Sequence, residues 1–427
     1  MGARRAGMAR QKRATANKKR GGVRFWQKVL AALLIVGVVP IALVSVLSIQ
    51  KTRTDLTDLG VTNIQQRSTS TAAALDAYLQ NRLDDIILVS RIPDVVRYAT
   101  TNDPALKEIA RDALKAATAR SAEYESVGVV DMTGKMAVSS VPSDDNTDLK
   151  FRQYFITPST TGQPYISDPS YSVITNKPAL FFSAAVMGPT GKPVAVVRSR
   201  LNLTAIWTIV EADTNSVGAG AHSFLLDDYG IRLAVSETKN NRQQAESLIY
   251  KPIAPIAPDV ATKLAADKRF GTISSPDKLV IDPLPTLKSA LDPLKTGFTP
   301  FAYGEGVTEQ RGVATRLVAK PWAYVLAVPL ATYTKAADDA TLNAVSVVAI
   351  GLLLSLIVGI LLTRSLVRPL RQLVGIATSV STGDVDLRSA HFETRRGDDI
   401  TREVASAFDR LLNALRFYAF ADEPGEE

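Results

Sequence analysis

Hydrophobic residues gather in two long runs near the two ends of the chain, Val29–Ile49 and Ala344–Leu362. The second run holds nineteen residues without a charge. As a helix that rises about 1.5 Å per residue it reaches roughly 28 Å, close to the thickness of a bilayer core. The pattern therefore predicts two transmembrane helices, the first with a kink at Pro40 of a kind that membrane helices tolerate.

Charged residues are distributed unevenly around these runs. Residues 1–50 contain ten Lys or Arg and no acidic residue, whereas residues 51–340 contain thirty-one of each sign. Positive residues stay on the cytoplasmic side of a membrane, which fixes the expected direction of both helices. The predicted topology is a basic cytoplasmic tail over 1–28, transmembrane helices over 29–49 and 342–363, and an extracytoplasmic region over 50–340.

The basic tail and the first apolar run admit two other interpretations. One is a cleaved signal peptide, but this run is longer than the usual apolar core of about 7–15 residues and lacks a clear A-x-A site. The other is a nucleic-acid-binding arm. The formal net charge of +8 comes from this tail alone, and attraction to anionic lipid explains it more simply. We expect membrane lipid, and no nucleic acid, as a partner.

The region between the runs begins with helical periodicity and then changes to strands. Apolar residues recur at mostly three- and four-residue steps over residues 52–96, which predicts a long helix that ends at Pro93, and a second helix is expected over 105–120. Strand-like segments follow, and they include two hairpins with the turn pattern D-x-x-G. The expected strands are 126–130, 135–139, 178–186, 192–203, 223–226, 231–236, 312–318 and 324–328.

The two hairpins have the same design. One turns at Asp131–Gly134 and the other at Asp227–Gly230, 96 residues later. Their repetition predicts two similar α/β modules in tandem, although such turns are common enough to recur by coincidence. Residues 251–300, polar and rich in proline, carry no clear element signal.

Several segments of the outer region resemble the double Cache sensors of bacterial chemoreceptors and sensor kinases. They are Phe151–Phe155, Tyr165–Pro169, Val194–Leu203 and Pro321–Pro329. The resemblance spans about residues 50–340. It implies an α+β fold of two PAS-like modules behind a long N-terminal helix, with a membrane-distal module over about 95–210 and a proximal one over about 220–330. It also implies a receptor in the bacterial cytoplasmic membrane.

The segment after the second run resembles a HAMP linker. Leu366-Val-Arg-Pro369-Leu370 matches the opening motif of that family, and Asp398-Asp399-Ile400 matches the start of its second helix. Apolar residues follow a heptad spacing on both sides of a Gly383-Asp384 connector, which a generic dimeric coiled coil would also show. The resemblance implies a HAMP domain over 364–418, with Pro369, Asp398 and Asp399 in signal relay, followed by an acidic tail over 419–427.

The sequence offers no motif for catalysis. It has no cysteine and two histidines, His222 and His391, without the spacing of a zinc site. Neither a phosphate-binding G-x-x-x-x-G-K-[ST] loop nor a G-x-S-x-G elbow is present. The nine residues after the predicted HAMP segment are too few for a kinase, a cyclase or an adaptor-binding hairpin. We therefore expect no enzyme activity and no cofactor.

The resemblance to double Cache receptors implies a ligand site in the distal module. There Arg152 would bind a carboxylate through its planar guanidinium fork. Receptors for amino acids in this family carry an acid where this chain has Arg200, so the ligand is expected to be an anion without an α-amino group. The expected ligand contacts are Arg152, Tyr154, Phe155, Tyr165, Asp168, Arg198 and Arg200.

Each of these arginines could instead have a purely structural role. Arg152 would otherwise form a salt bridge with a nearby acid such as Asp148, and Arg198 and Arg200 would otherwise be solvated on an outer strand face. The prediction for the whole chain is a dimeric two-pass receptor that senses a small anionic solute and signals to a separate cytoplasmic partner. Two other functions stay open: a fragment or relic of a sensor kinase, cyclase or chemoreceptor, and a membrane-anchored binding module that does not signal.

Overall fold

The computed structural model describes residues 25–214, 216–236, 247–267, 269–270 and 280–362, together with short pieces between 364 and 414. Pro369, Asp398 and Asp399 lie outside the described residues, as does most of the predicted HAMP segment. The chain divides into two compact units. One comprises residues 53–335, and the other joins residues 1–52 with 336–427.

Two helical segments are long and apolar enough to cross a membrane. Helix α1 (Phe25–Gly37) is followed at once by α2 (Val39–Val89), so the first apolar run is interrupted beside Pro40, as predicted. Helix α10 (Leu330–Leu362) contains the second run. Within the two apolar runs, most of the described apolar side chains are exposed, and Val36 for example is 76 % exposed. Lipid is the environment in which such a surface is stable.

The first sheet of the 53–335 unit is antiparallel and mixes long central strands with short edge strands. The strand order is β2-β1-β6-β5-β3, and β4 also pairs with β5. The hairpin predicted around Asp131–Gly134 is confirmed, because β1 and β2 flank that turn. The strands are β1 (Tyr124–Asp131), β2 (Met136–Ser139), β3 (Tyr165–Ile166), β4 (Ser170–Tyr171), β5 (Pro178–Met187) and β6 (Pro193–Leu201).

The second sheet repeats this plan. Its strand order is β8-β7-β11-β10-β9, so a hairpin again occupies one edge and a late strand the centre. The hairpin predicted around Asp227–Gly230 is confirmed. The order of strands in the two sheets supports the prediction of two similar modules. The strands are β7 (His222–Leu226), β8 (Arg232–Val235), β9 (Phe298–Tyr303), β10 (Gln310–Arg316) and β11 (Ala323–Pro329).

Short helices cover the sheets and fill the connections. Three of them begin at a proline, where the missing N–H costs no hydrogen bond. Two of these three, together with the first half of β9, fall in the proline-rich stretch for which no element was predicted. The helices are α3 (Pro93–Thr101), α4 (Lys107–Thr118), α5 (Gln153–Thr161), α6 (Thr204–Glu211), α8 (Pro258–Ala266) and α9 (Pro285–Leu291).

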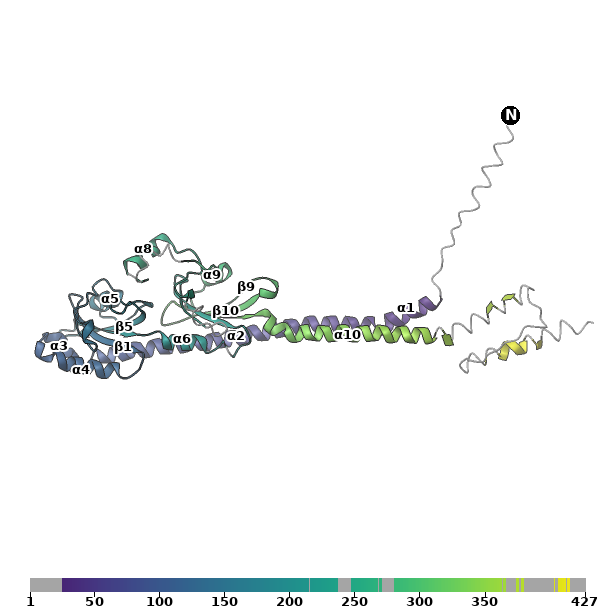
Figure 1. Ribbon diagram of the computed structural model, residues 1–427, viewed down its shortest axis with the longest axis horizontal. Helices are drawn as coiled ribbons and strands as arrows, with labels where there is room; N and C mark the ends of the chain where they lie inside the picture. The colour runs from purple at the N-terminus through teal and green to yellow at the C-terminus, as the bar shows by residue number, and fades with distance from the viewer. Residues whose placement is uncertain are drawn as a thin grey trace, which may run out of the picture. The chain divides into compact units, whose positions relative to one another are not determined.

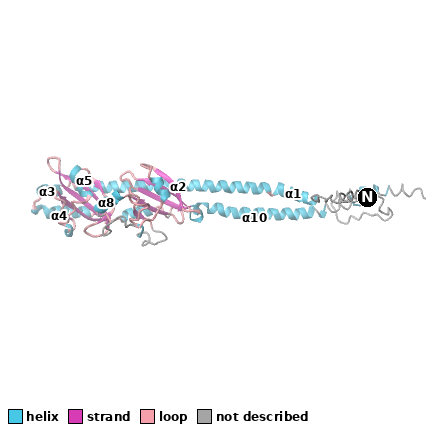
Figure 2. Cartoon of the chain, turned by 90° about the horizontal axis from the view of Figure 1, so that it is seen from above, coloured by secondary structure: helices cyan, strands magenta, loops and turns pink. Residues whose placement is uncertain are grey.

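The part of α2 within this unit runs along both sheets (Figures 1 and 2). Its residues Ile64, Leu75 and Leu79 are fully buried in one hydrophobic cluster with strands of both modules. The predicted long helix is therefore confirmed, but its end is corrected. Helix α2 stops at Val89, and Pro93 begins α3 instead of marking the end of α2.

Candidate ligand-binding site

Two arginines of β6 lie in the interior of the first module. Arg198 and Arg200 are 1 % and 3 % exposed, and both approach the buried carboxylate of Asp144. Alternation along a strand places residues two apart on the same face, and the prediction that these two share a face is confirmed. The alternative, in which both are solvated on an outer face, is wrong.

Each guanidinium of this pair is held by strand β1 and by the short helix η2 (Pro142–Asp144). Arg200 donates from Nε to Oε2 of Glu125 at 2.9 Å and from Nη1 to Oδ2 of Asp144 at 3.1 Å. Arg198 donates to the hydroxyl of Ser126 at 2.9 Å, and its Nη2 lies 3.8 Å from Asp144 Oδ2. Two acids therefore balance two arginines, a compensation that buried charges require. Burial lowers the pKa of Arg198.

Arg152 stands at the N-cap of α5 and is 1 % exposed. Its guanidinium donates to the backbone carbonyls of Asp267 and Tyr171 at 2.7 and 2.8 Å, and the Asp267 carboxylate lies 4.0 Å away. The alternative pairing with Asp148 is wrong, since Asp148 pairs with Lys150. Arg152 therefore connects α5 to a segment of the second module.

Aromatic residues lie beside these arginines. Tyr154 and Phe155, in the first turn of α5, are both buried, and the ring of Tyr154 stacks on that of Phe181 at 4.6 Å. The guanidinium of Arg198 lies 5.7 Å from the centre of the Phe181 ring. Burial raises the pKa of Tyr154, and the charges of Arg198 and Arg152 oppose that shift. Tyr154 therefore lies within electrostatic reach of both arginines.

Two donors of this cluster have no partner among the described residues. The Nε atoms of Arg152 and Arg198 are buried and make no hydrogen bond. An unsatisfied buried donor costs about 1–3 kcal/mol, and more when the group is charged. Each of these buried guanidinium groups therefore retains an N–H donor that a hydrogen-bond acceptor would satisfy.

The remaining predicted contacts, Tyr165 and Asp168, lie where the two modules meet. Asp168 accepts a hydrogen bond from Nε1 of Trp322 at 2.8 Å and pairs with Lys320 at 3.2 Å. The same lysine lies over the ring of Tyr165, 5.6 Å from its centre. Burial alone would raise the pKa of Asp168, but the charges of Arg269 and Lys320 outweigh it and the pKa is lowered.

A second buried ion pair belongs to this junction. Arg269 approaches Asp227 Oδ2 at 2.7 Å and Asp168 Oδ2 at 3.6 Å. Asp227 is the first residue of the D-x-x-G turn in the second module, and its Oδ1 accepts the backbone N–H groups of Tyr229 and Ile231. Burial raises the pKa of Asp227 to about 6 despite the neighbouring arginine.

Sequence reasoning missed the acids that hold the arginines. Asp144 and Glu125 precede Arg200 by 56 and 75 residues, and Asp267 follows Arg152 by 115. The only local signal was the acidic loop that contains Asp144. Among the described residues, no group of three His, Cys, Asp or Glu is placed to hold a metal ion.

The two-sheet unit has the fold of a Cache-type sensor domain. It resembles the sensor domain of the V. cholerae histidine kinase DctB, with a TM-score of 0.50 and 13% sequence identity over 63% of this chain and 96% of that one. This similarity confirms the predicted fold. At that identity it describes the fold alone.

Other solved structures align over similar lengths. The ligand-binding domain of the Campylobacter jejuni chemoreceptor Tlp3, in complex with L-valine, gives a TM-score of 0.46 at 13% identity, over 66% of this chain and 98% of that one. That of the Pseudomonas fluorescens chemoreceptor CtaA with L-alanine gives 0.41 at 16% identity, over 63% and 96%. No protein-family model and no curated protein sequence matches this chain.

Proposed function

We propose that this protein is a membrane receptor that binds a small anion without an α-amino group in the interior of its first module. The observation that carries the proposal is the pair of buried, unpartnered Nε donors on Arg152 and Arg198. Guanidinium groups suit carboxylate and phosphate because they present several N–H donors in one plane. The ligand class is therefore an organic acid, a dicarboxylate or phosphate.

The surrounding charges also disfavour an amino acid at this position. The acid that faces this cluster, Asp144, is already paired with Arg198 and Arg200. A ligand ammonium among the arginines would have to displace a buried guanidinium from that carboxylate, and breaking a buried pair costs about 3–5 kcal/mol. An anion can bind the arginines without breaking this buried ion pair.

Signalling follows from the way the binding module is attached. Helix α2 is continuous from the first apolar run to Val89 and packs against both sheets, and α10 leaves the second sheet directly after β11. We propose that both helices cross the bacterial cytoplasmic membrane, with both termini in the cytoplasm. A dimer then passes the change through the HAMP segment to a cytoplasmic signalling partner. Binding shifts such an equilibrium only by the difference in affinity between the two states.

A ligand screen on the full-length chain in lipid nanodiscs tests the binding proposal. At a hundred times its dissociation constant a ligand stabilises the folded state by about 2.7 kcal/mol, which a thermal unfolding scan detects. We expect a hit among acetate, succinate and inorganic phosphate. Stabilisation by amino acids alone, with none by any anion, would show the ligand class to be wrong.

The topology is tested separately with reporter fusions after residues 200 and 427. We expect opposite compartments for the two positions, because the basic N-terminal tail and Arg364 flank the two apolar runs on their cytoplasmic ends. The same compartment for both would exclude a two-pass receptor while leaving the solute-binding proposal standing.

A further inference from the structure

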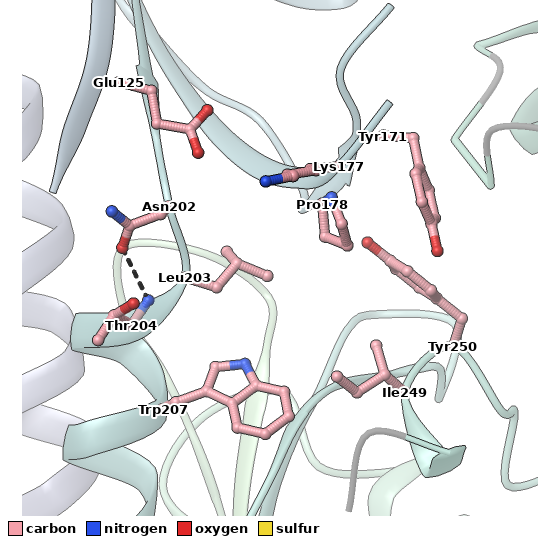
Figure 3. A pocket seen from close by; sticks show the side chains of 10 residues that line it. All are labelled: Glu125, Tyr171, Lys177, Pro178, Asn202, Leu203, Thr204, Trp207, Ile249 and Tyr250. Atoms are coloured by element: carbon pink, nitrogen blue, oxygen red, sulfur yellow. Dashed lines mark hydrogen bonds between the residues drawn. The ribbon is translucent and has the colours of Figure 1, made fainter. Parts of the chain in front are cut away.

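A cavity of about 500 Å³ lies where the chain leaves β6 and enters α6 (Figure 3). Its walls come from both modules: Glu125 and Asn202 belong to the first, whereas Ile249 and Tyr250 belong to the second. None of the three arginines of the proposed anion site lines it. The volume is within the range of small-molecule sites.

One end of this cavity carries two opposite charges. Figure 3 shows the carboxylate of Glu125 and the amine of Lys177 at the same end of the cavity, beside Asn202. Arg200 binds Oε2 of Glu125, whereas Oε1 has no hydrogen-bond partner among the described residues. The side chain of Lys177 is exposed, and the two residues do not form an ion pair with each other. An acceptor and a cation are therefore both available at this end.

The rest of the cavity is apolar and aromatic. Leu203, Trp207 and Ile249 form its floor in Figure 3, and the rings of Tyr171 and Tyr250 form one side with their centres 5.7 Å apart. Aromatic walls of this kind bind an apolar body and also attract a cation through their faces. The cavity is therefore polar at one end and apolar at the other.

Tyr250 adds two independent signs of a built site. Its side chain is almost fully buried, yet its hydroxyl has no hydrogen-bond partner among the described residues. Its backbone has a φ of 62°, a left-handed conformation that is unfavourable for a bulky residue. Strain and an unsatisfied polar group at one residue often mark a ligand site, because the bound ligand supplies the missing bond.

We infer that this cavity is a second solute site, specific for a zwitterion with an apolar body such as an α-amino acid with a large side chain. The ligand ammonium would lie against Glu125, its carboxylate against Lys177, and its side chain on Trp207. This inference does not rest on the anion site, because the two sets of lining residues differ.

Calorimetric titration of the full-length chain in nanodiscs with L-phenylalanine tests the inference. Two analogues that lack one charge each, phenethylamine and 3-phenylpropionate, measure the two polar contacts separately. We expect saturable binding of L-phenylalanine and an affinity about ten- to a hundredfold lower for each analogue, the usual effect of losing one charged hydrogen bond. Equal affinity for all three would overturn the zwitterion assignment.

Variants locate the binding. Lys177→Glu should weaken L-phenylalanine binding at least tenfold, whereas Lys192→Glu, an exposed lysine at the other end of the β5–β6 hairpin, should leave it unchanged. Tyr250→Phe removes only the hydroxyl and should weaken binding about fivefold. If Lys177→Glu and Tyr250→Phe both bind normally, this site is refuted. Loss of binding in Arg198→Met alone would place the amino acid among the arginines and refute the anion proposal as well.

Discussion

The two modules share one strand order but differ in what their central strand carries. In the first sheet β6 brings the buried Arg198 and Arg200 into the interior, whereas in the second sheet the equivalent strand β11 is apolar and almost wholly buried. The buried arginines of the second module, Arg232 and Arg269, lie outside its central strand. That strand instead packs Tyr324 beside Trp322, both 0 % exposed.

The two modules also form different hydrogen bonds to α2. The second module makes polar bonds to the helix through Thr315, which bonds Ser68, and through the backbone of Val318 and Ala319, which donates to Asp76. The first module bonds the same helix through Tyr124, whose hydroxyl donates to Asp85, and through Glu123, which accepts from the hydroxyl of Tyr78. The second module therefore meets α2 through backbone donors and a threonine hydroxyl, whereas the first meets it through a tyrosine hydroxyl and a carboxylate.

The most destabilising substitution that we predict lies in the apolar core around Trp322. Trp322→Ala should lower the free energy of unfolding by about 3–5 kcal/mol, because it leaves a cavity and also removes the hydrogen bond to Asp168. Urea denaturation of the full-length chain measures it. Val318→Ala, at a side chain that is 92 % exposed, is the control and should change stability by less than about 0.5 kcal/mol. A similar loss of unfolding free energy in both variants would contradict tight packing around Trp322.

The paired D-x-x-G turns give a prediction about pH. Burial raises the pKa of Asp227 from 3.8 to about 6, so between these values the folded state holds a proton that the unfolded chain has lost. The contribution of this group to stability is therefore greatest below about pH 4 and falls by roughly 2–3 kcal/mol as the pH rises through 6.

Asp227→Asn should remove that dependence, so that the variant loses less stability than the wild type between pH 4 and 7. Thermal unfolding at several pH values measures this difference. Asp131→Asn, at the equivalent turn of the first module, is the matched control and should leave the slope that Asp227 generates in place. If the stability of Asp227→Asn fell with pH as steeply as that of the wild type, another group would be responsible for the pH dependence.

A smaller loss of stability is expected when the hydrogen bonds between α2 and the β10–β11 turn are removed. Asp76→Ala removes the acceptor for the N–H groups of Val318 and Ala319 and should cost about 1 kcal/mol, comparable to the loss of a helix cap. Asp58 belongs to the same helix, and its carboxylate, unlike its carbonyl, accepts no hydrogen bond from the described residues, so Asp58→Ala is the control variant. Hydrogen exchange at the β10–β11 turn should rise in Asp76→Ala only. Unchanged exchange there would show that Asp76 does not hold the turn.

Local patterns were sufficient to predict much of this fold. The D-x-x-G turns identified both hairpins because a turn depends on its own four residues, and alternation placed Arg198 and Arg200 on one face. The apolar runs identified the two candidate membrane helices. Strand β9 and helices α8 and α9 were not predicted, because their sequences hold prolines and little periodicity. Their structure depends on packing: α9 contacts β9, and Leu264 of α8 joins a buried cluster with Ile231, Tyr250 and Phe270.

The charge balance of the site was beyond sequence reasoning. Arg200 is neutralised by Glu125 and Asp144, which come from other elements, and Arg152 bonds a carbonyl beside α8. Such partners are chosen by the fold and not by sequence neighbours. The sequence therefore pointed to these arginines, and an anionic ligand was predicted from them. The structure adds the partners of the arginines and shows that the Nε atoms of Arg152 and Arg198 have none among the described residues.

The most direct test of the account compares one buried arginine from each module. Arg198→Met and Arg232→Met each remove a buried charge of similar size, and Arg232 pairs with Asp282 in the second module. Calorimetry on the full-length chain would use whichever anion stabilises the wild type. We expect Arg198→Met to lose about ten- to a hundredfold in affinity and Arg232→Met to bind like the wild type. Equal affinity in both variants, with both folded, would contradict an anion site in the first module.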